Sequence, residues 1–487
     1  MTSREWLVLT VVAAPSVGVV LSLLLPQRLL SRAAAVIGVA TATAAIALSV
    51  VALADPDSRL IGHWVVVDAT GGVLVGVIGI VGLSSVLVSP LVLGAGHESL
   101  FRAFHADRIY WLAFFAFWTV LLAVPLAGNL GVAWILIEAT TAASALLVGF
   151  SGRARALEAG WKYLILTSLG LGVALLGIVM LTAGRGGGGL DALDWNSLSH
   201  DKLDPDIALV AYVLLLAGLA AKIGWAPVHN WLPDAHSEAP APISALLSAA
   251  LLPAVLLVAW RSQQAISPTI GADVAGDVMI IFGIVSLAVA VPFLWRSLAW
   301  KRLLAYSSLE HMGVIALGIG FGGTLALAGV TVHIVGHALA KSLGFYAAIP
   351  LLGHEPRAAK HAVRGVGRTQ PALGASLGIS LGALAGLPPS PLFFSEVLII
   401  AGGFQMGHPW VAATAALLLA LGFLGLGHAL IEMIVGKTRR RDRSIAPGLR
   451  GVIVLTGVSV VVLLALAGVA VWLPGSAIVT AIERGLA

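Results

Sequence analysis

The sequence contains no cysteine. Iron–sulfur clusters and thiolate-held nickel need several cysteine ligands, so this chain cannot itself hold such a centre. Disulfide bridges are excluded for the same reason. We expect no cofactor in this chain.

Charge is also scarce. Only 10% of the 487 residues are charged, whereas soluble domains carry about 25%. Hydrophobic residues make up 59%, and the mean hydropathy is +1.01. Apolar stretches near the roughly 20 residues that a spanning helix needs recur from end to end. Because they also lack the alternation of a transmembrane barrel, the sequence predicts an all-α integral membrane protein.

About 14 apolar segments have the length of a membrane span. Short joints with turn residues, such as Gly322-Gly323, separate them. The first segment has no convincing small-residue cleavage site, so we interpret it as a span and not as a removed signal peptide. The predicted spans are residues 5–25, 33–54, 70–94, 110–127, 131–151, 162–183, 207–232, 241–261, 278–295, 303–322, 324–350, 372–404, 409–436 and 450–474.

Most of the 28 lysines and arginines fall in loops that follow odd-numbered spans. The positive-inside rule places these loops in the cytoplasm and both termini outside. The net charge of +5 therefore indicates the loops of a multi-pass protein in the cytoplasmic membrane and not nucleic-acid binding. The arginine cluster at 437–443 is expected to contact anionic lipid, or alternatively to dock a partner.

Ionisable residues interrupt the apolar spans. A charge at the bilayer centre costs about 2.5–3.5 kcal/mol on insertion scales, so such residues are rarely accidental. The residues are Glu138, Lys222, Glu310, His311, His333, His337, Lys341, Glu396, His428 and Glu432.

The first candidate pair is Glu138 in the fifth span and Lys222 in the seventh. Burial favours the neutral form of each side chain, whereas pairing favours the charged forms. Moving the two apart would then release or recruit a proton. A static structural ion pair is the alternative interpretation.

The second candidate group is His333, His337 and Lys341, spaced four residues apart. This spacing places the three side chains on one helical face with a small drift per step. An imidazole can accept a proton at one nitrogen and donate at the other, so the row suggests a proton relay. A polar helix interface is the main alternative. Metal binding by the two histidines is a weaker one, because no third ligand is adjacent.

Proline interrupts two of the predicted spans. Pro227 follows Lys222 in the seventh span, and Pro388 precedes Glu396 in the twelfth. Interrupted spans at corresponding places in two halves indicate inverted repeats around central ion sites. We predict two inverted five-helix repeats, spans 4–8 and 9–13, each containing a broken helix. The predicted units are residues 1–109, 110–262, 263–436 and 437–487.

Several stretches together resemble the antiporter-like proton-translocating membrane subunits of respiratory complex I, multisubunit cation/proton antiporters and energy-converting hydrogenases. These stretches are Trp134–Glu138, Lys222–Ala235, Lys301–Ser308, His333–Lys341 and Gly386–Glu396. Within this group the chain is most similar to the hydrogenase-4 component F type, through the stretches 234–238 and 308–311.

The resemblance implies a role for each buried residue. Glu138 and Lys222 would form a first half-channel. Lys341 would be the central residue and Glu396 the terminal one on the exit side. The implied path contains Glu138, Lys222, His333, His337, Lys341 and Glu396.

The sequence departs from the family pattern at Ser248, where a histidine often stands. A hydroxyl cannot titrate, so the link from Lys222 toward Lys341 must use waters or another group. Ala299 likewise replaces an acid before the Lys-Arg pair of the tenth span. Auxiliary roles are expected for Glu310, His311, Asp234, His236 and Ser248, with proton uptake near Asp234 and His236.

The implied function is that of a proton-translocating subunit of a membrane-bound hydrogenase or NADH-dehydrogenase-like complex. Its partners would be other membrane subunits and a peripheral redox arm, either nickel–iron hydrogenase-like or quinone-reductase-like. A subunit of a multisubunit cation/proton antiporter is an alternative that the charge spacing does not separate. A scaffold that has lost transport is the third, and the complete set of buried acids and lysines argues against it.

Overall fold

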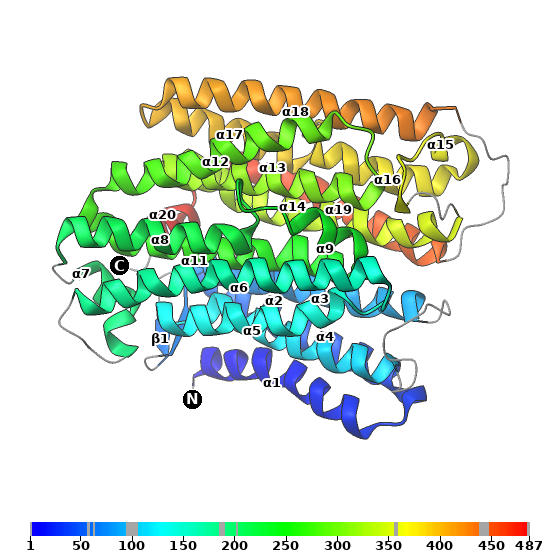
Figure 1. The fold of residues 1–487 in the computed structure, drawn as a ribbon, viewed down its shortest axis with the longest axis horizontal. Helices are drawn as coiled ribbons and strands as arrows, with labels where there is room; N and C mark the ends of the chain where they lie inside the picture. The colour runs from blue at the N-terminus through cyan, green and yellow to red at the C-terminus, as the bar shows by residue number, and fades with distance from the viewer. Residues whose placement is uncertain are drawn as a thin grey trace.

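The computed structural model describes residues 2–55, 59–61, 64–93, 106–184, 190–200, 203–354, 359–437 and 448–484. Nearly all of the described chain is helical (Figure 1). The helices are α1 (Ser3–Leu24), α2 (Gln27–Ala54), α3 (Ala69–Leu93), α4 (Ala106–Ala123), α5 (Leu130–Val148), α6 (Ala154–Ala183), α7 (Trp195–His200), α8 (Pro205–Ile223), α9 (Leu232–Glu238), α10 (Ala241–Leu246), α11 (Leu252–Ile270), α12 (Ala272–Leu294), α13 (Trp300–Phe321), α14 (Gly323–His354), α15 (Val366–Thr369), α16 (Pro371–Leu384), α17 (Pro391–Gln405), α18 (Pro409–Val435), α19 (Leu449–Trp472) and α20 (Ala477–Arg484).

The predicted helical membrane fold is confirmed. In the described ranges, 13 helical stretches are long and apolar enough to cross a membrane. The predicted twelfth span is divided between two shorter apolar helices, α16 and α17, with residues 385–390 between them. The predicted seventh span is also broken, because α8 ends at Ile223 and α9 starts at Leu232.

Several predicted boundaries are wrong. Helix α6 starts at Ala154, eight residues before its predicted start, because hydropathy marks only the apolar part of a helix. A π-helical turn, η4 (Leu247–Leu251), joins α10 to α11, and this continuous helix extends to Ile270. Arg261 therefore lies inside a helix and not in an outer loop. Neither the short α20 nor a two-stranded antiparallel hairpin, β1 (Arg59–Ile61) with β2 (Val65–Val67), was expected.

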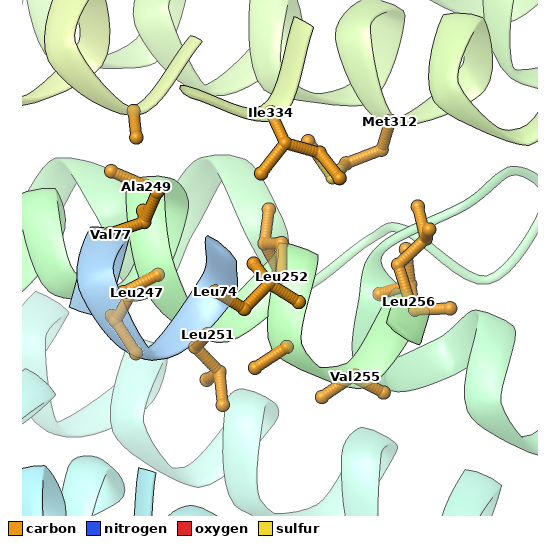
Figure 2. Packing of buried hydrophobic residues seen from close by; sticks show 14 of the residues in the cluster. Leu74, Val77, Leu247, Ala249, Leu251, Leu252, Val255, Leu256, Met312 and Ile334 are labelled. Atoms are coloured by element: carbon orange, nitrogen blue, oxygen red, sulfur yellow. The ribbon is translucent and has the colours of Figure 1, made fainter. Parts of the chain in front are cut away.

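The core lies in the middle of the helix array. In Figure 1, α1 and α18 lie along opposite edges, with α11, α13 and α14 between them. Helices α11 and α13 are buried over almost their whole length, whereas only 22% of the apolar window is buried in each of α1, α18 and α19. Figure 2 shows Leu252 of α11 at the centre of this core, with Leu74 of α3 on one side and Ile334 of α14 and Met312 of α13 above it.

The order of helices agrees with the predicted repeats. In the first unit, α4, α5 and α6 precede the broken pair α8/α9 and the continuous α10–η4–α11. In the second unit, α12, α13 and α14 precede the broken pair α16/α17 and α18. The interrupted span is thus the fourth of each unit. The exact unit boundaries stay a prediction.

Candidate functional site

The end of α8 positions the first buried lysine. Gly224 caps α8 in the left-handed conformation, with φ +81°, which residues with a Cβ rarely adopt. Trp231 closes the break by donating from Nε1 to the Ala221 carbonyl at 2.6 Å. Lys222 therefore sits in the last helical turn, and its side chain is fully buried.

Lys222 forms no ion pair with Glu138 among the described residues, so the predicted direct pair is wrong. Its Nζ donates instead to the Thr141 hydroxyl and the Tyr163 hydroxyl, both at 2.6 Å. The half-buried Glu138 accepts a hydrogen bond from Ser168 at 2.7 Å through Oε1. Its Oε2 is buried without a hydrogen-bond partner. Thr141 lies one helical turn after Glu138 on α5, so hydroxyls occupy the space near both charges.

The hydroxyl contacts around Lys222 have a defined direction. Thr141 donates to the Ile137 carbonyl, and Ser144 donates to a backbone carbonyl of α5. Because the Ser144 hydrogen is used in this way, Tyr163 must donate to Ser144, at 2.7 Å. Both hydroxyls next to Lys222 consequently present lone pairs to its ammonium.

Lys341 on α14 occupies a similar environment in the second half. It is fully buried, and Nζ donates to the Leu304 carbonyl and the Ser307 hydroxyl of α13. The next residue, Ser308, shares a hydrogen bond of 2.8 Å with Ser248. Ser248 lies in the π-helical turn η4, a local widening that is frequent at functional sites.

Three histidines meet beside Lys341. The ring of His337 lies 5.2 Å from that of His311, measured between centroids. His311 Nδ1 lies 3.0 Å from His333 Nε2, and His333 Nδ1 lies 2.8 Å from Ser395 Oγ. All three rings are buried, and both nitrogens of His337 lack a hydrogen-bond partner. His311 was predicted only as an auxiliary residue, but it joins His337 to His333.

The hydrogen bonds that link His311, His333 and Ser395, which we call the histidine row, also run in one direction. Ser395 donates its hydroxyl hydrogen to the Leu392 carbonyl at 2.8 Å. It must therefore accept from His333 Nδ1–H, which leaves the lone pair of neutral His333 at Nε2. His311 Nδ1–H then donates to that lone pair, and the lone pair of neutral His311 is left at Nε2, which is buried without a partner. A proton received at His311 Nε2 can displace protons toward Ser395.

Glycines make room for the two acids of the second half. A Cβ at Gly386, in the break between α16 and α17, would lie 2.8 Å from Glu396 Oε2. A Cβ at Gly422 of α18 would lie 2.0 Å from Glu310 Oε1. Glu310 is buried, and its Oε2 has no hydrogen-bond partner. Glu396 follows Ser395, so an acid stands at the end of the histidine row.

Helix α9 gathers ion pairs at the side that the charge pattern predicts to be cytoplasmic. Asp234 pairs with Arg302 at 2.9 Å and with Lys162 at 3.4 Å. Glu238 pairs with Arg153 at 3.3 Å. These contacts tie α9 to α6 and α13.

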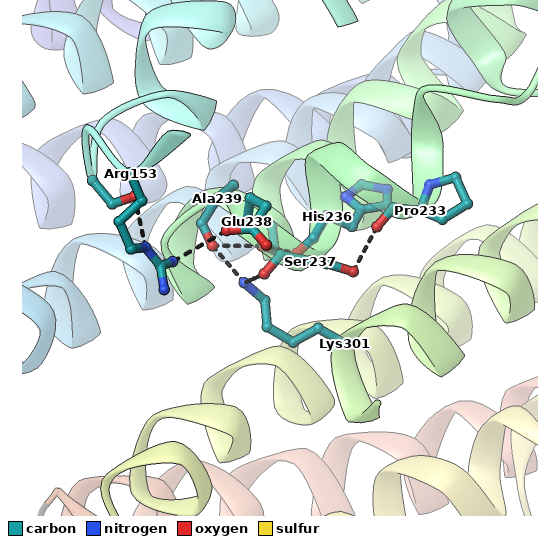
Figure 3. Close-up of polar contacts among 9 residues, drawn as sticks. Arg153, Pro233, His236, Ser237, Glu238, Ala239 and Lys301 are labelled. Carbon is teal, nitrogen blue, oxygen red and sulfur yellow. Dashed lines mark hydrogen bonds and ion pairs between the residues drawn. The ribbon is translucent and has the colours of Figure 1, made fainter. Parts of the chain in front are cut away.

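A cavity of about 400 Å³ opens beside α9. Ser237, Glu238, Arg153 and Lys301 are among the residues that line it. Figure 3 shows Lys301 reaching across to the end of α9, where its Nζ donates to the carbonyls of Ser237, at 3.0 Å, and Ala239. Lys301 was assigned to a loop, but it lies in α13 and its exposed fraction is only 8%.

His236 lies inward of this cavity. It is fully buried, and neither ring nitrogen has a hydrogen-bond partner. Its ring lies 6.2 Å from that of Trp231, which in turn lies 4.7 Å from Tyr163, the partner of Lys222. His236 thus lies near the Lys222 group through Trp231 and Tyr163, and the Ser248–Ser308 pair lies next to Ser307, a partner of Lys341. No hydrogen bond joins the Lys222 group to the Lys341 group among the described residues.

Sequence reasoning missed the hydroxyl partners of the acids and lysines, which are Thr141, Ser144, Tyr163, Ser168, Ser307 and Ser395. It also missed a buried ion pair. Arg261 Nη2 lies 2.8 Å from Asp68 Oδ2, with both side chains almost fully buried. Hydroxyl residues are common in spans, so only the spacing of Thr141 and Ser144 after Glu138 could have indicated the first group.

These features define a class of protein: a multi-pass helical membrane protein with two interrupted spans and buried acids, lysines and histidines between them. Residues 127–422 match the family described as the NADH:quinone oxidoreductase/Mrp antiporter transmembrane family. The chain belongs to this family, and the predicted resemblance is confirmed.

Two relatives illustrate the range of the family. A hydrogenase-4 component F homolog of Methylacidiphilum infernorum is 37% identical over 321 residues, which cover 64% of this chain and 67% of the relative. An NADH-quinone oxidoreductase subunit N of Desulforudis audaxviator is 29% identical over 441 residues, 84% of each chain.

Solved structures share the whole fold. A chain of the membrane-bound sulfane sulfur reductase, an archaeal respiratory membrane complex, superposes with a TM-score of 0.85 at 20% identity, covering 99% of this chain and 98% of the other. A chain of the Mrp complex from Dietzia gives a TM-score of 0.79 at 19% identity over both complete chains. The helix arrangement is therefore that of an antiporter-like membrane subunit.

Proposed function

We propose that this chain translocates protons across the cytoplasmic membrane, as a subunit of a membrane-bound hydrogenase-like or NADH-dehydrogenase-like complex. The observation that carries the proposal is the buried row from His311 through His333 to Ser395, whose hydrogen bonds all run in one direction. Its last member stands beside Glu396, at a break in a membrane-spanning segment. Such a row moves a proton by successive short transfers, each between neighbouring groups.

Each titratable group has a separate task in this scheme. Glu138 and Lys222 hold charge in the first half, each beside its own hydroxyl partners. Lys341 holds charge beside the histidines, since Ser307 and a carbonyl accept from its ammonium. A proton that reaches His311 Nε2 displaces the Nδ1 proton to His333 and the His333 Nδ1 proton to Ser395. Ser395 then releases its own hydroxyl proton once the hydroxyl turns away from the Leu392 carbonyl, and we assign the role of final acceptor to Glu396, the next residue of α17. Between the halves, the buried and unpartnered His236 supports a link that Ser248 alone cannot provide.

The partners follow from what the chain itself lacks. Without cysteine it supplies no ligands for an iron–sulfur cluster, so electrons would pass through a peripheral redox arm. Both named relatives are components or subunits of larger assemblies. We place both termini outside and the ion pairs of α9 on the cytoplasmic side, as the distribution of lysine and arginine indicates.

The test is proton transport by the complete complex in sealed, inside-out membrane vesicles, followed with a pH-sensitive dye. We expect acidification of the lumen when the redox substrate is supplied, and loss of that signal when Lys341 or His333 is replaced. Transport of protons that requires a sodium gradient, with no redox partner co-purifying, would instead assign the chain to a cation/proton antiporter. Identification of the co-purifying chains separates these outcomes directly.

A further inference from the structure

Three side chains of the second half form a group that proton transfer alone does not require. One ring nitrogen each of His311 and His333 and one carboxylate oxygen of Glu396 lie within 4.8 Å of one another. They come from α13, α14 and α17, three helices that pack against each other. The sequence offered only His333 and His337 as a weak metal pair, and it lacked the third ligand that the fold supplies.

The donor set has a recognisable chemistry. Two imidazoles and one carboxylate form a frequent ligand set of zinc sites that keep a fourth position open. Zinc holds nitrogen ligands at about 2.0–2.1 Å, which places two tetrahedral ligands about 3.3 Å apart. His311 Nδ1 and His333 Nε2 are already 3.0 Å apart. The carboxylate oxygen lies within 4.8 Å of both ring nitrogens, so it must approach them by no more than about 1.5 Å to reach this spacing.

The surroundings prepare the histidines for a metal. A ligating histidine usually donates its other ring N–H to a neighbouring acceptor, which fixes its orientation and tautomer. His333 does this through Nδ1–H to Ser395, so Nε2 carries the lone pair. The proton on His311 Nδ1 can move to Nε2, which is buried without a partner. The Leu384 carbonyl lies next to this ring and would accept that hydrogen.

The break between α16 and α17 lies directly against the group. Leu387, Pro388 and Pro389 are exposed, and a Cβ at Gly386 would lie 2.8 Å from Glu396 Oε2. Glu396 is therefore the ligand that stands next to this break.

We propose that His311, His333 and Glu396 bind a divalent transition-metal ion of the zinc class, which takes the place of the proton shared between the two rings. A bound ion would hold both histidines as ligands and stop proton transfer along the row. The binding stands on the geometry alone, and the inhibition of transport rests on the proposed function.

The experiment measures zinc binding to the purified complete complex after removal of loosely held metal with a chelator. Equilibrium dialysis gives the number of zinc ions bound, and the visible absorption of Co²⁺ in place of Zn²⁺ reports four-coordinate geometry. Variants His333→Gln and Glu396→Gln are compared with the wild type. The matched control is His428→Gln, since His428 pairs with Glu432 on the exposed surface of α18 and offers a site of similar composition.

We expect one zinc ion to be lost in His333→Gln and Glu396→Gln and retained in His428→Gln. In Ser395→Ala, which keeps every ligand but removes the fixed tautomer, the affinity should fall about 10-fold to 100-fold. Unchanged stoichiometry and affinity in His333→Gln, or equal loss in His428→Gln, would overturn the proposal. If His333→Gln does not assemble, Glu396→Gln and Ser395→Ala test the same site, because both variants keep the two histidine rings in place.

A transport assay separates metal binding at this group from proton translocation by the chain. Zinc should inhibit proton translocation by the wild-type complex. It should not change the dye signal of vesicles that lack the complex. If the wild type binds zinc at this group but translocates no protons, the metal site stands and the proposed function fails.

Discussion

The two buried lysines have closely similar contacts but different neighbours. Lys222 and Lys341 are both fully buried, and each donates to two oxygens, of which at least one is a hydroxyl. Around Lys222 the further groups are hydroxyls and the half-buried Glu138. Around Lys341 they are imidazoles. The first site can hold and exchange a proton locally, whereas the second can also pass it along a row.

The breaks beside the two lysines differ as well. The break after Lys222 is held by Trp231 and by the ion pairs of Asp234 and Glu238. At the break before Glu396, residues 387–389 are exposed, and no ion pair is found among its described residues. The two breaks therefore differ in how firmly they are held, and under the proposed function the clamped break is the one on the uptake side.

Lys341→Ala tests most directly whether the second site carries the relay. Proton transfer by a positioned group typically contributes about 10²–10⁴-fold, so translocation by the complex should fall by about 10²-fold or more. Dye-monitored acidification of vesicles measures the effect, with His428→Ala as the control for a change outside the row. Translocation at the wild-type rate in an intact Lys341→Ala complex would refute the relay.

Ser395→Ala tests whether the direction of the histidine row matters. The hydroxyl accepts from His333 and fixes its tautomer, so its loss should slow translocation about tenfold. Ser395→Thr keeps the hydroxyl and should restore most of the rate. Equal rates in the alanine and threonine variants would mean that tautomer control is irrelevant. Redox turnover measured in parallel distinguishes loss of coupling from loss of assembly.

Glu138→Gln tests how much the first site contributes to translocation. It keeps the shape and the hydrogen bond from Ser168 but removes the proton-binding group. We expect a loss of about tenfold in translocation per redox turnover, equivalent to about 1.4 kcal/mol. Unchanged coupling in this variant would reduce the first site to a structural role and leave the histidine row to act without it.

Ser168→Ala should have the smallest effect. It removes one hydrogen bond to Glu138, and such a bond contributes about 0.5–1.5 kcal/mol net. We therefore expect a few-fold decrease in translocation, smaller than that of Glu138→Gln. An effect as large as that of Lys341→Ala would show that the first site, and not the second, limits the rate of translocation.

The sequence was informative where a single residue breaks a strong rule. Charged residues inside apolar spans located Glu138, Lys222, Lys341 and Glu396, because hydrocarbon tolerates such residues only where they serve a purpose. Proline in the same spans located both interruptions. Boundaries were less well predicted, since hydropathy does not report the polar turns by which α6 and α11 extend beyond their apolar parts.

Contacts between helices were beyond sequence reasoning. Opposite charge suggested that Glu138 and Lys222 would pair, but side-chain reach and helix packing place hydroxyls next to the lysine instead. Arg261 stands at the end of the predicted eighth span, and the fold buries it against Asp68, 193 residues away. Such contacts depend on which helical faces meet, and no local pattern encodes that.

By itself, therefore, the sequence determined that this protein crosses the membrane many times, where its spans are broken, and which buried side chains can carry a proton. Only the tertiary structure decided that His311 lies between His337 and His333, that Ser395 contacts His333, and that ligand atoms of His311, His333 and Glu396 lie within 4.8 Å of one another. The physical reason is that composition and hydropathy act along the chain. Hydrogen bonds and ligand sets instead require atoms of different helices to lie within a few ångströms of each other.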